Sequence, residues 1–231
     1  MVFVEAKVGP SNCGDPKEKF TVQYFDKEGN MTIRSGGTRT WRCNNPGALL
    51  KSPYSMGKDR HAIGSAGDGK YSYAVYPDYK TGHEALIVML GGSVYSHLTL
   101  REASSRYVKE DPDHICKIIK LSGNRLNPDQ KIQSLKPEEF EIYWKAIEAN
   151  ENWAVGQEDF IERWFIAGVH KKRGVIFEYY IKTAEGNGWI AKSEAIKLAK
   201  ENKLHAILVH MKSGSLYLRS ENGTKPFVLI T

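Results

Sequence analysis

An acidic residue closes an apolar stripe in segment 137–151. Phe140, Trp144, Ile147 and Glu151 are spaced at i, i+4, i+7 and i+11, which places them on one face of an α-helix. A proline and two glutamates at its start are typical of a helix N-terminus. At the other end, desolvation and the negative pole of the helix dipole both favour a protonated carboxyl group. We therefore predict that Glu151 is a general acid.

Two other interpretations of this segment stay open. Glu148 is an alternative acid, because it lies about 40° from Trp144 around the helix axis. In the purely structural interpretation, Glu151 is an exposed acid in the last helical turn, beside a core Trp153.

A second group of polar and aromatic residues precedes this helix in the chain. Asn44 and Asn45 lie in a Gly- and Pro-rich loop, where their amides could hydrogen-bond a ligand or position a water molecule. Alternatively, they cap their own turn. Aromatic rings that could stack on sugars are Trp41, Tyr71, Tyr73, Tyr76 and Tyr79.

These segments resemble lysozyme-like proteins of phage particles and bacterial secreted effectors. Arg42-Cys43-Asn44-Asn45-Pro46-Gly47 resembles their "R-N-N-N-P-G-N" block, and 73–86 resembles "F-x-V-F-x-x-x-x-x-G-x-x-A-L". The chain departs from the first block at Cys43 and Ala48, where the family has Asn. The segment 146–156 also resembles the "A-x-x-E-S-G-W-G" helix of the glucosaminidase branch of the lysozyme superfamily, but it follows the other blocks instead of preceding them.

The resemblance implies an α+β fold with a mostly helical, lysozyme-like core, circularly permuted so that the acid-bearing helix comes last. It implies cleavage of peptidoglycan glycan strands by a muramidase, glucosaminidase or lytic transglycosylase. Glu151 would be the acid, while Asn44, Asn45, Trp41, Tyr73 and Tyr76 would bind substrate. Asp78 and Glu84 are weak candidates for a second carboxylate, and a single acid suits a lytic transglycosylase.

Two rival functions remain. One is a non-catalytic protein of a phage particle or secretion spike that holds glycan without cutting it. The other is a cell-wall amidase or endopeptidase with Cys43 as thiolate nucleophile and His61 or His83 as its partner.

The sequence divides into three predicted parts. Residues 1–37 contain a β-hairpin lead-in, 38–172 the catalytic domain, and 173–231 a small α/β accessory module. The last part resembles a small bacterial module of unknown function with "W-I-x-K-x-E-A-I" and "M-K-S-G-x-x-Y-L-R-S". Within the catalytic domain, a final helix is predicted over 157–166.

The amino-acid composition limits which partners the protein is expected to bind. The net charge of +6 suits an anionic polymer, and peptidoglycan is expected rather than nucleic acid, because Lys/Arg runs are short. No metal or cofactor is expected, since the seven histidines are scattered and Cys13, Cys43 and Cys116 share no metal-ligand spacing. No apolar run is long enough to cross a membrane.

The N-terminus shows no signal peptide. We therefore expect synthesis in the cytoplasm, and delivery to the periplasm or cell wall by phage or secretion machinery. An immunity protein is an expected partner if the chain is an antibacterial toxin.

Overall fold

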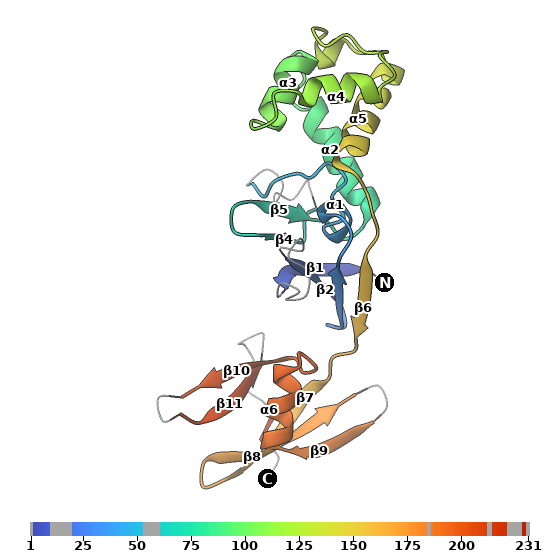
Figure 1. Cartoon of the computed structure of the whole chain (residues 1–231). Helices are drawn as coiled ribbons and strands as arrows, with labels where there is room; N and C mark the ends of the chain where they lie inside the picture. The colour runs from blue at the N-terminus through green and yellow to red at the C-terminus, as the bar shows by residue number, and fades with distance from the viewer. Residues whose placement is uncertain are drawn as a thin grey trace. The chain divides into compact units, whose positions relative to one another are not determined.

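The computed structural model describes residues 2–9, 20–52, 61–183, 186–211, 214–220 and 228–229 (Figure 1). The chain forms two compact units. The first contains Met1–Lys27 and Thr32–Asp159, and the second contains Glu28–Met31 and Phe160–Thr231.

The balance of helix and strand differs from the sequence prediction. The structure is 31% helical and 34% strand, with six helices and three sheets in the part that is described. The fold is therefore mixed α/β, and the prediction of a mostly helical, permuted lysozyme-like core is wrong. The error arises mainly at the N-terminus, because the strands expected as a lead-in belong to the main sheet.

That sheet has six strands in the order β5-β4-β1-β2-β3-β6. Their bounds are β1 (Phe3–Gly9), β2 (Thr21–Asp26), β3 (Met31–Ser35), β4 (Gly64–Gly67), β5 (Ser72–Val75) and β6 (Gln157–Ile161). Strand β1 pairs antiparallel with β2, and it meets β4 in parallel where Ala6 is opposite Gly64. Val22, Tyr24 and Val75 are fully buried in the core of this sheet.

The helices of the first unit form a second core. They are α1 (Arg39–Arg42), α2 (Tyr79–Gly91), α3 (Leu100–Tyr107), α4 (His114–Leu121), the 3-10 helix η1 (Ile132–Ser134) and α5 (Pro137–Glu151). Figure 1 shows α3, α4 and α5 gathered beyond the end of α2. Leu86, Leu100, Ile118 and Ile147 from four of these helices are buried together.

Local signals explain where these helices begin and end. Thr99 and Glu102 form a capping box at the start of α3, and a proline starts α5 as predicted. Helix α5 ends after Glu151 because Asn152 adopts a positive φ of 61°, which a continuing helix cannot accommodate.

The second unit is a small α/β structure with its own core. Strands β7 (Phe165–Lys172), β8 (Val175–Lys182), β9 (Asn187–Ala191) and β12 (Val228–Leu229) form a sheet in the order β12-β7-β8-β9. Helix α6 (Lys192–Lys200) follows, and β10 (Ala206–His210) pairs with β11 (Leu216–Ser220). Tyr179, Ile181, Leu198 and Leu204 are buried in this core.

The observed division of the chain differs from the predicted one. The compact units separate after Asp159, whereas the predicted boundary at 172–173 falls in the turn between paired strands β7 and β8. The predicted helix at 157–166 is instead strand β6 and the start of β7. In the described part of the chain, no helix is long and apolar enough to cross a membrane.

Two glycines of α2 provide a test of how this helix packs. A Cβ at Gly82 would lie 1.9 Å from the backbone oxygen of Asn44, whereas one at Gly91 would have no atom within 4 Å. We expect Gly91→Ala to stabilise the fold by up to about 1 kcal/mol, because Ala favours helix over Gly. Gly82→Ala should destabilise it despite the same gain, because helix and loop must move apart. Urea unfolding of both variants measures the difference, and equal stabilities would contradict the packing described.

Candidate functional site

A cavity of about 770 Å³ opens in the first unit. Tyrosine rings provide much of its wall, together with apolar side chains such as Leu49 and Met89. The residues that bear on its chemistry are Arg39, Tyr73, Tyr76, Tyr95, Tyr107 and Glu151. Such a site, mostly apolar with a few convergent polar groups, is typical of small-ligand and substrate binding.

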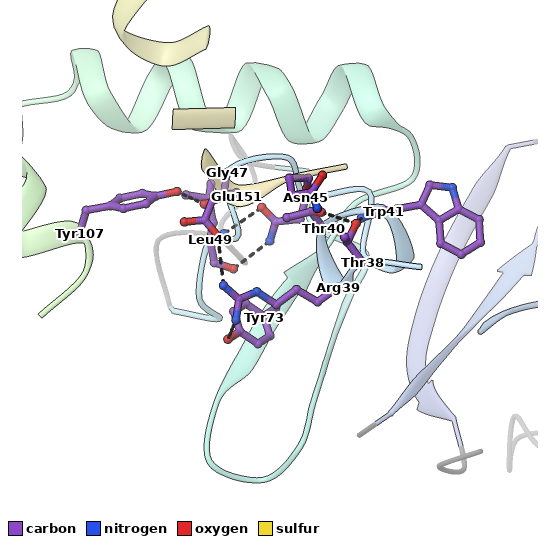
Figure 2. A network of polar contacts seen from close by, with 11 residues as sticks. Thr38, Arg39, Thr40, Trp41, Asn45, Gly47, Leu49, Tyr73, Tyr107 and Glu151 are labelled. Carbon is purple, nitrogen blue, oxygen red and sulfur yellow. Dashed lines mark hydrogen bonds and ion pairs between the residues drawn. The ribbon is translucent and has the colours of Figure 1, made fainter. Parts of the chain in front are cut away.

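Glu151 is the buried acid of this cavity. Its side chain is only 7% exposed, and its Oε2 lies 3.0 Å from Nη2 of Arg39 (Figure 2). Burial raises the pKa of the Glu151 carboxyl above its ordinary value, while the hydrogen bond and charge of Arg39 act in the opposite direction. The net direction favours the protonated acid.

Arg39 connects the acid to a tyrosine of strand β5. Its Nη1 donates to the Tyr73 hydroxyl at 3.0 Å, and its guanidinium carbon lies 4.9 Å from the centroid of the same ring. Burial raises the pKa of Tyr73, so this hydroxyl stays neutral and can donate a hydrogen bond. Glu151, Arg39 and Tyr73 therefore form one polar chain along the cavity wall (Figure 2).

A set of hydrogen bonds between the end of α5 and the start of α1, the backbone join, holds Glu151 and Arg39 in place. The Thr40 hydroxyl donates to the Asn152 carbonyl at 2.5 Å. Thr38 N donates to the Ala154 carbonyl at 2.9 Å, and Ala154 N donates to Thr38 Oγ1 at 3.1 Å. Glu151 and Arg39 are each next to a joined residue, although they lie 112 positions apart in the chain.

The alternative acid, Glu148, has a different environment. Its Oε1 lies 2.7 Å from His83 Nδ1, and its Oε2 accepts a hydrogen bond from Tyr79 at 3.0 Å. It does not line the cavity. Of the two glutamates proposed from the sequence, the structure places Glu151 in the cavity wall.

Asn44 and Asn45 are both buried and hydrogen-bonded within the protein. The Asn45 amide nitrogen donates to the carbonyls of Leu49 and Ala74, both at 2.9 Å, and its oxygen accepts from Leu49 N at 2.8 Å. Asn44 donates to the Tyr76 carbonyl and accepts from Arg34. Neither lines the cavity. Asn45 caps its own loop at Leu49, whereas Asn44 bonds outside its own turn. Both amides brace the loop against strand β5 and the residue that follows it.

The aromatic candidates separate into two groups. Tyr71, Tyr73 and Tyr76 line the cavity. Trp41 is buried elsewhere, with the guanidinium of Arg34 4.9 Å from its ring centroid, and Tyr79 packs edge-on against Trp153. The Trp41 side chain therefore stabilises the fold around α1.

Cys43 is buried and unsuited to nucleophilic attack. Burial raises the pKa of its thiol to about 12, so the reactive thiolate is scarce at neutral pH. Its proposed partner His83 bonds to Glu148. Cys116 is a free, exposed thiol, and Cys13 lies outside the described residues. Among the residues that the structure describes, no three or more potential metal-ligating side chains lie together.

Several cavity residues carried no signal in the sequence. Glu110 lines the cavity and accepts a hydrogen bond from the Tyr71 hydroxyl at 2.7 Å, which lowers the pKa of the Glu110 carboxyl. Tyr107 donates to the Gly47 carbonyl (Figure 2). Nothing in the sequence pairs Arg39 or Glu110 with Glu151, and only the fold brings them to this site.

A scan against protein families finds no match, and a search of curated proteins also finds none.

The titration of Glu151 tests its environment. We expect a midpoint above 4.5, the ordinary value for Glu, in ¹³C NMR of the carboxyl carbon, assigned by comparison with Glu151→Gln. Because the folded-state pKa is raised, the protonated acid stabilises the fold at low pH, and this stability is lost as pH rises through the raised pKa. A midpoint at or below 4.5 would contradict this environment.

Replacing Arg39 separates the two opposing effects on that carboxyl group. Arg39→Met should raise the Glu151 midpoint further, because the cation that favours the carboxylate is gone. Arg101→Met is the matched control, since Arg101 is an exposed arginine paired with Asp129 and should leave the midpoint unchanged.

Asn45 should be a structural residue of the loop. Asn45→Ala removes the bonds to Leu49 N and to the Ala74 carbonyl, and one of the two bonds to the Leu49 carbonyl, which also accepts from Ala74 N. We therefore expect a loss of roughly 2–4 kcal/mol in the free energy of unfolding. Asn127→Ala is the control, because Asn127 is exposed and accepts a bond from Asp129 N; its loss should be about 1 kcal/mol or less. Similar losses in denaturant unfolding would argue against the bracing role.

Proposed function

We propose that this chain cleaves the glycan strands of peptidoglycan, with Glu151 as the general acid. The observation that carries the proposal is a buried carboxyl group of raised pKa at the end of α5, in a cavity walled by tyrosine rings. Glycosidic cleavage needs a carboxylic acid that is still protonated when the leaving oxygen requires a proton. The resemblance of segments 38–49 and 73–86 to lysozyme-like proteins supports peptidoglycan as substrate.

Arg39 has a defined role in this proposal. When Glu151 gives its proton to the glycosidic oxygen, the group left behind is a carboxylate 3.0 Å from the Arg39 guanidinium. The ion pair is therefore strongest after proton transfer, and an interaction that strengthens along the reaction lowers the barrier. Tyr73 holds Arg39 from the other side.

The cavity also offers a second carboxylate. Glu110 has a lowered pKa while Glu151 has a raised one, and opposite shifts in one site are the pattern by which an acid and an ionised partner are recognised. A hydrolase would use Glu110 as the ionised group, whereas a lytic transglycosylase would need Glu151 alone. Product masses separate the two, since an anhydro product lacks one water.

A second candidate function is glycan binding without cleavage. The Arg39–Glu151 contact favours binding without cleavage, because a permanent ion pair would keep the Glu151 carboxylate ionised and bonded to Arg39. Delivery by a phage particle or secretion apparatus, and neutralisation by an immunity protein, stay predictions for either function.

The two candidates give different results on purified sacculi. We expect the wild-type chain to release soluble muropeptides, and Glu151→Gln to reduce the rate on the order of a hundredfold or more, as for loss of a general acid. Mass spectrometry of the released fragments measures both rate and product type.

Glu148→Gln is the matched control, since it is an equivalent change one helical turn away, outside the cavity. It should retain activity within a few-fold of wild type. Sacculi bound without fragment release would establish the binding function instead, and equal losses in both variants would remove Glu151 from the acid role.

A further inference from the structure

The positive charge of the chain lies in its C-terminal part. Residues 160–231 contain 12 Lys and Arg against 6 Asp and Glu, whereas residues 1–159 contain 21 of each. The net charge of +6 therefore belongs to the stretch that builds most of the second unit. Because the part that bears the cavity is balanced, attraction to an anionic polymer must come mainly from this stretch.

One face of the β7-β8-β9 sheet carries a row of aromatic side chains. Tyr180 is opposite Trp189 across β8 and β9, and His170 is opposite Glu178 across β7 and β8. Residues that alternate with these along β8, such as Tyr179, are buried in the core with α6. Since side chains alternate between the two faces of a strand, the row lies on the face away from that core.

The rings of this row contact one another and remain partly exposed. The ring centroids of His170 and Trp189 are 3.5 Å apart and nearly parallel, and those of Tyr180 and Trp189 are 5.1 Å apart. Phe177 continues the row beside His170 and is 46% exposed. Neither Tyr180 nor Trp189 belongs to the core of the second unit, so packing of that core does not explain them.

Polar side chains lie both at the centre of this aromatic face and at its two ends. In the middle, His170 Nδ1 lies 3.1 Å from Glu178 Oε2, and both side chains are about one-third exposed. Lys172 at the end of β7 and Arg173 in the β7–β8 turn are exposed cations, and Lys182 is exposed at the far end of β8. The face thus has a carboxylate and an imidazole at its centre and cations at both ends.

We infer that this face binds the carboxylate-bearing glycan of the cell wall, meaning polysaccharide strands with acidic peptides attached. Aromatic rings supply apolar surface for the faces of sugar rings, Glu178 and His170 can exchange hydrogen bonds with sugar hydroxyl groups, and the terminal cations meet peptide carboxylates. The choice of polymer rests on the proposed function. A nucleic-acid strand fits less well, because a carboxylate at the centre of the face would repel its phosphates.

Binding can be measured apart from cleavage. In a full-length chain carrying Glu151→Gln, sedimentation with purified sacculi should give binding that weakens with added salt. Adding Trp189→Ala should reduce the apparent affinity about tenfold or more, as for a central aromatic anchor. Lys182→Glu should also weaken binding. Tyr217→Ala is the control, because Tyr217 is a half-buried tyrosine of hairpin β10–β11 and should leave affinity unchanged.

Three outcomes would overturn this inference. In the first, the Trp189→Ala and Tyr217→Ala chains sediment equally and unfold at the same temperature as the parent chain. In the second, both Trp189→Ala and Lys182→Glu sediment as well as the parent chain. In the third, the chain binds a single-stranded oligonucleotide more tightly than sacculi, and this binding depends on Trp189. The result is independent of the cleavage proposal, because the chain tested lacks the acid. Conversely, Trp189→Ala with Glu151 intact should still release fragments from soluble glycan.

Discussion

The backbone join between the end of α5 and the start of α1 is the constraint on which the candidate site depends. Hydrogen bonds among Thr38, Thr40, Asn152 and Ala154 connect segments more than a hundred residues apart. The positive φ of Asn152 turns the chain out of α5, and Gly37 permits the close approach, because a Cβ there would lie 2.4 Å from the Ala154 carbonyl. The join fixes the distance between Glu151 and Arg39.

This arrangement sets two opposing effects on one carboxyl group. Burial favours the neutral acid, whereas the guanidinium favours the carboxylate, and the net pKa is raised. An acid poised between the two states can release a proton to a substrate and be stabilised afterwards. Removing the guanidinium would raise the pKa of the carboxyl group further, and exposing the site to water would remove the effect of burial that raises it.

The sequence predicted local structure well and long-range structure poorly. The start of the helix at Pro137 and its end near Glu151 follow from signals within a few residues, and the structure confirms them. The six-stranded sheet could not be predicted, because β1 finds its partners in β2 and β4, and β6 joins the same sheet after all the helices of the first unit. Segment 157–166 was predicted as a helix because an isolated edge strand has no sequence signal of its own.

The same limit applies to the site. The apolar spacing of α5 placed Glu151 at a helix end facing other elements, which the structure shows, but nothing near Arg39 indicated its partner. Asn44 and Asn45 were expected to face substrate, and their amides instead complete the backbone hydrogen bonds of a loop and strand that lie far apart in sequence. Amide side chains serve both roles equally well, so residue type alone could not separate them.

The most direct test of the account is a crystal structure of the Glu151→Gln chain with a peptidoglycan tetrasaccharide. If Glu151 is the acid, sugar rings should lie against Tyr73 and Tyr76, with a glycosidic oxygen within about 2.6–3.2 Å of the side chain at position 151, the reach of a general acid. A tetrasaccharide bound outside this cavity, or one whose glycosidic oxygens all lie beyond that reach, would contradict the assignment of Glu151 as the acid.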